Sequence, residues 1–335
     1  MAFGVGWLFS RLDILHWRIE SRHSPKAYFK GLNHLLNGQQ DRAVDSFIEA
    51  VQNDPDTLEL HFTLGNLFRR RGEFDRAVRV HEHLLARSDL NEADRARARL
   101  ALAQDFWRAG LLDRAEAALI GLDSLEAQQL MLSICERGRD WIGAKRAAQK
   151  LQAMGAGSYI KREAHYLCEQ KLYQEAISLS PESPRAYLEL AKQVPSERAY
   201  ALMIAAIERA PQAAPILADA FIHAAQTEFN LKNAVATLAH IYDETQSLDV
   251  LQALIRAGWR SETEGYAQHL AHTPSLVAVS HLIHAPEAKI ALLNATEPLM
   301  RYRCASCGFE AKQYFWQCPG CQAWDSYPFK RVEEL

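Results

Sequence analysis

The chain has 335 residues, of which 48% are apolar and 24% charged, and its formal net charge is −3. This composition is typical of a folded globular protein and excludes a disordered or collagen-like chain. The length favours two domains, and the slightly negative charge argues against a protein that binds nucleic acid through bulk positive charge.

The N-terminal segment 1–22 has two interpretations. Residues 1–10 carry no charge, but Arg11 ends the run, and a spanning helix needs about 20 apolar residues. A basic excess follows, as on the cytoplasmic side of membrane helices. The segment is either a partial N-terminal membrane anchor with a basic juxtamembrane part, or an amphipathic helix that lies on the first repeat.

A six-residue motif, Gly-x-x-Asp-Arg-Ala, recurs at 38–43, 72–77 and 110–115. The first two copies lie 34 residues apart, which is the period of the two-helix tetratricopeptide repeat. Gly31 and Gly65 share this offset, and we expect them to let the two helices of one repeat approach closely.

Alanines occupy one position of the predicted second helices. Ala43 and Ala77 are small where the second helix crosses the next repeat. Ala144 and Ala176 hold the same position in two later helices, which we predict over 141–151 and 172–179.

The repeat pattern weakens along the chain. The third interval is 38 residues, which predicts a longer turn over 88–94. Residues 216–230 and 232–258 are predicted to form two or three further helices, and no strand is expected before residue 300. The sequence therefore predicts an all-α tetratricopeptide (TPR) superhelical solenoid over 23–272, with about seven repeat-equivalents and degenerate later ones.

A solenoid of this kind is more often a binding surface than an enzyme, because its stacked helix pairs form a groove without a buried catalytic pocket. No catalytic residue is predicted. The histidines show no ligand spacing and are interpreted as surface or groove residues, among them His81, His83, His269 and His272. The protein-binding candidates of the groove are Arg69, Arg70, Arg71 and His81, although a run of three arginines is also typical of a solvated helix end.

The connector 273–300 contains prolines but also the apolar runs 276–279 and 290–293. It is too apolar for a free linker, so we expect it to pack and to dock the C-terminal module onto the last repeats.

The strongest motif consists of two Cys-x-x-Cys pairs separated by ten residues. Its four thiolates predict one tetrahedral zinc or iron site, with turn amides that point at the sulfurs. The predicted ligands are Cys304, Cys307, Cys318 and Cys321. Four protein ligands close the site, which favours a structural or electron-transfer role over hydrolysis. The other two cysteines, Cys135 and Cys168, are expected to be buried thiols.

The module predicted over 301–327 is too small to build its own core, so bound metal has to supply folding free energy. Gly308 follows the first cysteine pair, where a positive φ is often needed. We expect an aromatic cover made of Tyr302, Phe309, Tyr314, Phe315, Trp316 and Trp324. A short tail, 328–335, follows.

The stretch YFKGLNHLLNGQQDRAVDSFIEAV, the phrase HFTLGNLFRRRGEFDRAVRVHEHLL and the ending RYRCASCGFEAKQYFWQCPGCQAW resemble the lipopolysaccharide assembly protein B family. The resemblance is close over 24–120 and 301–327 and architectural between them. Gln322 departs from the family pattern, which usually has glycine after the last cysteine.

The resemblance implies TPR repeats with a C-terminal rubredoxin-like domain whose four cysteines bind one iron ion, although the spacing alone fits zinc equally. It implies an inner-membrane protein with one N-terminal anchor, incomplete in this chain, and its domains on the cytoplasmic side. The implied function is a regulatory adaptor that promotes degradation of the UDP-3-O-acyl-N-acetylglucosamine deacetylase of lipid A synthesis by the AAA+ protease FtsH. Other lipopolysaccharide assembly proteins are further implied partners.

Three alternatives stay open. A general TPR scaffold at the inner membrane needs only the repeats, and a rubredoxin-type electron carrier uses the same cysteines. A zinc-ribbon nucleic-acid module needs a basic surface, but acidic residues offset the basic ones around the cysteines; we therefore expect no nucleic acid as partner.

Overall fold

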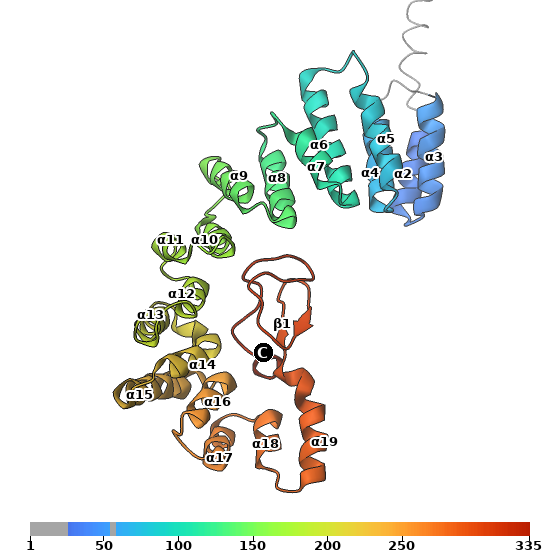
Figure 1. Ribbon diagram of the computed structural model, residues 1–335. Coiled ribbons are helices and arrows are strands. Elements are labelled where there is room, and N and C mark those ends of the chain that lie inside the picture. The colour runs from blue at the N-terminus through green and yellow to red at the C-terminus, as the bar shows by residue number, and fades with distance from the viewer. Residues whose placement is uncertain (1–25, 54–57) are drawn as a thin grey trace, which may run out of the picture. The chain divides into compact units, whose positions relative to one another are not determined.

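The computed structural model describes residues 26–53 and 58–335 (Figure 1). These residues are mostly helical, with one two-stranded sheet near the C-terminus, and they confirm the predicted fold class. The chain divides into two compact units, Met1–Gly138 and Arg139–Leu335. The predicted N-terminal segment 1–22 lies outside the described residues. Within those residues, no helix is both long enough and apolar enough to cross a bilayer.

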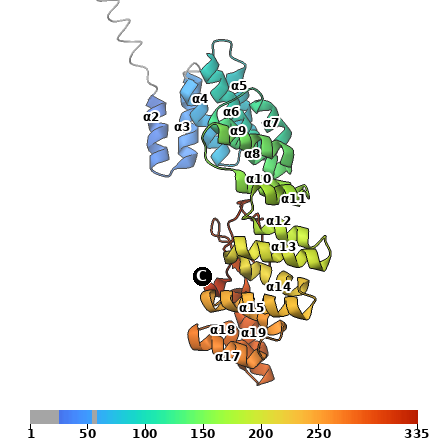
Figure 2. The same cartoon turned by 90° about the vertical axis from the view of Figure 1, so that its left-hand side faces the viewer.

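The first unit is a series of helices that pack on their neighbours in chain order, and Figure 2 shows α2 and α3 as an antiparallel pair. Its described helices are α2 (Lys26–Leu36), α3 (Gln40–Asn53), α4 (Leu58–Arg70), α5 (Phe74–Leu85), α6 (Glu92–Ala109), α7 (Leu112–Leu119) and α8 (Leu125–Gly138).

The small-residue position of the repeat is fully buried wherever the motif predicts it. The five alanines at this position have no exposed surface: Ala43, Ala77, Ala115, Ala144 and Ala176. A larger side chain there would push the second helix away from its neighbours, because protein interiors are close-packed.

The helical glycines permit the predicted close approach of paired helices. A Cβ atom at Gly65 would lie 2.5 Å from the ring of His81, and one at Gly31 would lie 3.0 Å from the ring of Phe47. Each ring therefore occupies the space that a side chain on the facing helix would need.

The longer turn predicted over 88–94 is wrong at its C-terminal end. The helix α6 already begins at Glu92, because the side chain of Asn91 accepts a hydrogen bond from the amide of Asp94 at 2.8 Å. This interaction is an N-cap that starts the helix early. Part of the extra length of this repeat therefore extends α6, which has 18 residues.

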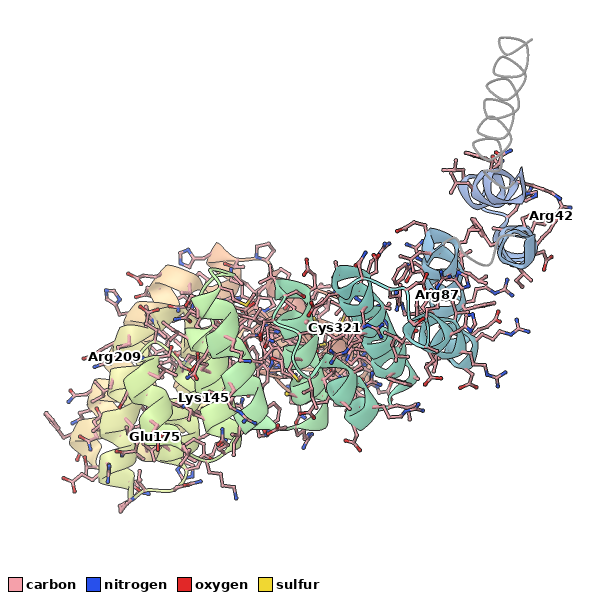
Figure 3. The ribbon with its side chains drawn as sticks, turned by 90° about the horizontal axis from the view of Figure 1, so that it is seen from above. Arg42, Arg87, Lys145, Glu175, Arg209 and Cys321 are labelled. Carbon is pink, nitrogen blue, oxygen red and sulfur yellow. The ribbon has the colours of Figure 1, made fainter. Side chains whose placement is uncertain are left out.

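The second unit continues the helical series and ends in the cysteine-rich module. Its helices are α9 (Trp141–Ala153), α10 (Ile160–Glu169), α11 (Tyr173–Leu179), α12 (Pro184–Ala191), α13 (Ser196–Arg209), α14 (Ala214–Ala224), α15 (Glu228–Thr245), α16 (Leu248–Arg256), α17 (Glu262–His272), α18 (Leu276–Leu282) and α19 (Pro286–Thr296), with the 3-10 turns η1 (Pro211–Ala213), η2 (Glu297–Met300) and η3 (Val332–Glu334). Figure 3 shows Lys145, Glu175 and Arg209 on α9, α11 and α13.

The prediction of two or three further helices over 216–230 and 232–258 is confirmed, because α14, α15 and α16 cover these stretches, but the breaks between the helices lie at other residues. One break precedes α15, where the Thr227 side chain accepts from the amide of Asn230 and caps the helix. The next break follows α15, where Gln246 adopts a left-handed conformation with φ 51°. These local cap and turn conformations leave little signal in the apolar periodicity.

The connector 273–300 forms α18, α19 and η2. Its first apolar run packs as predicted, since Val277 and Ala278 belong to the core of the unit. The second run does not, because Ile290 is 61% exposed and Thr296 alone is buried on α19.

Strands β1 (Tyr302–Arg303) and β2 (Glu310–Ala311) are antiparallel, with Tyr302 opposite Ala311 and Arg303 opposite Glu310. As predicted, no strand precedes residue 300 in the described ranges.

Candidate metal centre and its contacts with the helices

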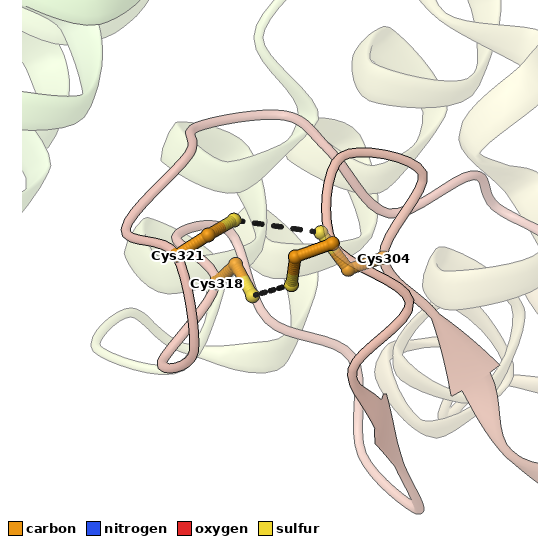
Figure 4. Close-up of side chains that lie close together, drawn as sticks. Cys304, Cys318 and Cys321 are labelled. Carbon is orange, nitrogen blue, oxygen red and sulfur yellow. Dashed lines mark hydrogen bonds between the residues drawn. The ribbon is translucent and has the colours of Figure 1, made fainter. Parts of the chain in front are cut away.

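The four cysteines of the C-terminal module converge at one point. Their sulfur atoms all lie within 4.8 Å of one another. The Sγ atoms of Cys304 and Cys321 are 3.8 Å apart, and those of Cys307 and Cys318 are 3.7 Å apart (Figure 4). Four sulfurs around one ion at metal–sulfur distances of about 2.3 Å lie about 3.8 Å from one another. The residues therefore fit a tetrahedral tetrathiolate metal site.

Two similar turns build this site. In the first, the amide of Gly308 donates to the carbonyl of Cys304 at 2.9 Å, and in the second, the amide of Gln322 donates to the carbonyl of Cys318 at 2.8 Å. Both donors have positive φ, 77° for Gly308 and 61° for Gln322. The positive φ predicted for Gly308 is confirmed. Gln322 adopts the same left-handed conformation, which costs a residue with a side chain more conformational free energy than it costs glycine.

Backbone amides point at the sulfurs, as the spacing predicted. Burial raises the pKa of Cys304, but a hydrogen bond with the Ser326 side chain and hydrogen bonds from the amides of Cys307 and Ser306 bring the pKa down to about 6. Burial also opposes ionisation of Cys318, whose pKa is nevertheless lowered by the amides of Cys321 and Gly320. Stabilised thiolates are the form that binds metal.

The module buries one cysteine of each pair. Cys304 and Cys318 are each 1% exposed, whereas Cys307 and Cys321 are exposed. The centre therefore has one face towards the protein and one towards solvent.

The predicted aromatic cover is correct in part. Tyr314 and Phe315 pack against the buried cysteines, together with Tyr302 and with Tyr327, which the prediction missed. Phe309 is 42% exposed and covers little.

The side chain of Trp324 packs against helices α9 and α10 and not against the cysteines. Its ring stacks on His165 with centroids 4.8 Å apart, and it meets Trp141 and Tyr166 edge-on. The next residue, Asp325, accepts a hydrogen bond from Nε2 of His165 at 2.8 Å. The loop that follows Cys321 therefore packs against helices α9 and α10.

Strand β1 of the module and the tail 328–335 contact α16 and α18. The hydroxyl of Tyr302 donates to the carboxylate of Asp249 at 3.0 Å, and Arg331 forms an ion pair with the same carboxylate at 2.9 Å. Glu334 accepts from the amide of Leu248, and Glu333 accepts from the amide of Leu276. Figure 1 shows the module beside this series of helices within the second unit.

The groove candidates of the first unit lie in different environments. Arg70 is exposed, but Arg69 is largely buried and donates to Asp105 at 2.8 Å, and Arg71 pairs with Glu73 at 2.6 Å. The interpretation of the three arginines as a solvated helix end is therefore wrong for Arg69.

The interpretation of the histidines as surface or groove residues is also wrong at four positions of the described ranges, which are His61, His81, His165 and His269. His81 has no exposed surface and contacts Asp105, because Gly65 leaves room for its ring. His81 therefore cannot contact a protein bound at the surface of the helices. His269 is 1% exposed and bonds to the hydroxyl of Tyr242.

The two isolated cysteines, Cys135 and Cys168, are buried as expected. Burial raises the pKa of Cys168 to about 11. This thiol is therefore protonated at neutral pH and unreactive.

The fold and the site define an all-α repeat protein with a C-terminal metal-binding module of four cysteines. Residues 302–327 match the family described as rubredoxin metal binding domain. Over its full length the chain is 28% identical to lipopolysaccharide assembly protein B of Escherichia coli K12, of which it covers 97%. It is 27% identical to the protein of the same name from Haemophilus influenzae, with 97% of this chain and 95% of the relative covered. The predicted resemblance to this family is confirmed.

Two solved structures resemble parts of the chain at low TM-scores. The Naa15/Naa10 complex bound to HypK-THB matches 81% of this chain and 47% of its own, at 12% identity and a TM-score of 0.44. A tetratricopeptide repeat protein from Parabacteroides merdae matches 81% of this chain and 97% of its own, at 15% identity and a TM-score of 0.33.

Proposed function

We propose that the protein acts in lipopolysaccharide assembly as a non-enzymatic adaptor. The observation that carries the proposal is the similarity to lipopolysaccharide assembly protein B across the whole chain, which includes the repeats and the cysteine module together. The expectation that the chain is not an enzyme is confirmed by these relatives, whose names describe assembly.

The proposed mechanism is proximity. One surface of the helices holds the UDP-3-O-acyl-N-acetylglucosamine deacetylase, while an N-terminal anchor in the inner membrane keeps the complex beside the FtsH protease on the cytoplasmic side. Holding two proteins together raises their effective concentration without any new chemistry. Degradation of the deacetylase then slows entry of precursors into lipid A.

The metal module has a structural role in this proposal. Iron or zinc bound by the four cysteines would supply folding free energy to residues 301–327. All four coordination positions belong to protein, so no position is left for a substrate. The ordered module would then fix Trp324, and the tail that follows would fix Arg331, on the repeat helices, which would hold the binding surface in one shape.

The test is the half-life of the deacetylase in cells that contain or lack this protein. We expect the half-life to lengthen on depletion and to recover with the unaltered protein. A Trp324→Ala variant should recover it poorly, whereas Phe229→Ala, which removes an exposed aromatic ring on α15, should recover it fully. An unchanged half-life on depletion would refute the adaptor role.

A second candidate is a rubredoxin-type electron carrier, which the exposure of Cys307 and Cys321 favours. An exposed edge is where a redox partner would approach, and exposure also sets the reduction potential of an iron–sulfur centre. Voltammetry of the iron-loaded protein tests this candidate. A reversible one-electron wave together with electron transfer to a cellular partner would support it.

A further inference from the structure

A cavity of about 440 Å³ lies in the second unit between the helices and the cysteine module. One wall comes from Lys161 at the start of α10 and from the loop 180–184 between α11 and α12, and the other wall includes Tyr314, Trp316 and Phe329. Figure 1 shows the module beside α10 and α12. The volume is in the range of small-molecule sites, about 300–1,000 Å³. No cysteine lines the cavity, so it is distinct from the metal centre.

Two serine hydroxyls of this loop are available to a ligand. Ser180 and Ser183 are only 6% and 8% exposed, and neither Oγ atom has a hydrogen-bond partner among the described residues. Both oxygens retain solvent-accessible surface, and both residues line the cavity. Because polar side chains that are this deeply buried are nearly always paired in proteins, two free hydroxyls in one cavity wall indicate a bound partner.

The fold of the loop brings the two hydroxyls together. The Ser183 amide donates to the Ser180 carbonyl at 3.0 Å, which closes a four-residue β-turn with Pro181 at its second position. Ser183 is also the N-cap residue of α12, but its side chain caps no amide. The first turn of a helix has free amides and the positive end of the helix dipole, so a carboxylate group is favoured beside these serines.

Two opposite charges in the cavity wall also lack a partner. The ammonium group of Lys161 and the carboxylate of Glu182 are exposed and form no ion pair with each other or with any other described residue. The other charged residues of the wall, His165 and Asp325, pair with each other at 2.8 Å. Arg185, which contacts the second ring nitrogen of His165, forms its ion pair outside the cavity wall. The cavity therefore offers one free cation and one free carboxylate.

The wall on the module side offers apolar contact. The rings of Tyr314 and Phe329 stack with centroids 5.4 Å apart, and Trp316 meets Tyr314 edge-on at 5.0 Å. The hydroxyl of Tyr314 already donates to the carbonyl of Tyr327 at 3.0 Å. These aromatic rings can therefore bury an apolar group of a ligand opposite the polar loop.

The charges of the wall define the chemical class of the ligand. A simple anion would meet the carboxylates of Glu182 and Asp325, and a simple cation would meet the ammonium group of Lys161. An uncharged molecule would pair with the two serines but would leave both free charges of the cavity without a partner. A ligand with one carboxylate and one ammonium group pairs with all of these groups.

We propose that this cavity binds a small zwitterion with an apolar part, such as an α-amino acid with a large apolar side chain. The ligand's carboxylate lies between Lys161 and the hydroxyls of Ser180 and Ser183. Its ammonium group lies beside Glu182, and its apolar part lies on the aromatic wall. The site goes beyond the proposed adaptor function and does not depend on it.

The test uses four probes with the same phenyl group on the full chain loaded with zinc: phenylalanine, 3-phenylpropionate, phenethylamine and 2-phenylethanol. Calorimetry should show that phenylalanine binds at least about tenfold more tightly than the other three, each of which lacks one charge or both. In protein labelled with 5-fluorotryptophan, the resonance of Trp316, assigned with Trp316→Phe, should shift as phenylalanine is added. Absence of phenylalanine binding, or equally tight binding of any other probe, would overturn the assignment.

Glu182→Gln removes the predicted partner of the ammonium group and should weaken phenylalanine binding about tenfold, whereas 3-phenylpropionate, which has no ammonium group, should bind no more weakly than before. The matched control is Glu175→Gln, which changes an exposed glutamate on α11 outside the cavity. Equal phenylalanine binding by the two variants would refute the contact with Glu182.

Ser183→Ala removes a free hydroxyl without removing a cap and should weaken phenylalanine binding about fivefold, the effect of one lost hydrogen bond. Ser178→Ala is its control, because Ser178 lies on α11 and bonds only to its own helix at Gln174. Circular dichroism checks that both serine variants fold. Equal phenylalanine binding by these two variants would refute the role of the loop hydroxyls.

Discussion

Asp249 and Arg331 form an ion pair that joins helix α16 to the last residues of the chain. The guanidinium donates Nη2 to Oδ1 and Nε to Oδ2, each at 2.9 Å, and the two side chains are only 10% and 16% exposed. The Tyr302 hydroxyl donates to the same carboxylate. One acidic side chain on a repeat helix therefore holds both the first strand of the cysteine module and the segment that follows it.

The first prediction concerns this pair. Asp249→Asn should lower the free energy of unfolding of the second unit by about 3–5 kcal/mol, because it leaves the buried Arg331 charge uncompensated. Urea unfolding followed by circular dichroism measures the change. The matched control is Asp219→Asn, which breaks an exposed pair with Arg256 and should cost at most about 1 kcal/mol. Equal effects of the two variants would contradict the importance of Asp249.

The second prediction concerns metal. Cys318→Ser removes one ligand and frees the loop that carries Trp324, so the melting temperature of the second unit should fall and a chelator should have no further effect. Ser306→Ala, an exposed non-ligand in the first cysteine turn, should leave melting and chelator response unchanged. If Cys318→Ser melts as the unaltered chain does, the module does not stabilise the helices. Elemental analysis of the same samples distinguishes iron from zinc.

The third prediction concerns the two cysteine turns. Gln322 has φ 61°, a conformation that costs a residue with a side chain about 1–2 kcal/mol. Gln322→Gly should therefore stabilise the module by about 1 kcal/mol or less, since glycine also gains entropy in the unfolded chain. Gly308→Ala is the converse change at φ 77° and should destabilise by a similar amount. Chemical denaturation of metal-loaded protein measures both, and a loss of stability in Gln322→Gly would contradict the argument.

The fourth prediction concerns the first unit. Gly65→Ala would place a Cβ atom 2.5 Å from the buried ring of His81, and overpacking of this kind costs about 1–3 kcal/mol. Gly138→Ala is the control, because the added Cβ would meet only Leu112 at 3.6 Å and helix propensity favours alanine. Thermal melts should show a decrease for the first variant and none for the second. A neutral Gly65→Ala would show that the helix pair can separate without cost.

The fifth prediction concerns pH. Burial lowers the pKa of His269 below its ordinary value of 6.5. The unfolded chain therefore binds this proton first, and the stability that the neutral ring provides is present above about pH 6.5 and is lost as the pH falls through the lower folded pKa. His269→Gln keeps a partner for Tyr242 but does not titrate. Urea unfolding at several pH values should show that the free energy of unfolding falls less at acidic pH in this variant than in the unaltered chain. Parallel pH profiles of the two proteins would show that His269 does not cause the loss of stability.

The sequence by itself determined the repeat architecture and the metal ligands. The 34-residue offset, the small position at Ala43 and Ala77 and the glycine at 65 encode close helix packing. Small side chains that recur at a fixed helical period can be recognised in the sequence, because their role depends on neighbouring residues of the same helix pair. The cysteine spacing is equally local, because each pair lies on one short turn.

Only the tertiary structure decided how the module meets the helices and which polar residues are buried. His165 pairs with Asp325 across 160 positions, and Asp249 pairs with Arg331 across 82. No sequence period links such residues, because their contact results from the summed geometry of all the helices between them. The same reason explains why His81 and His269, which resemble surface histidines in sequence, are buried beside partners on other helices.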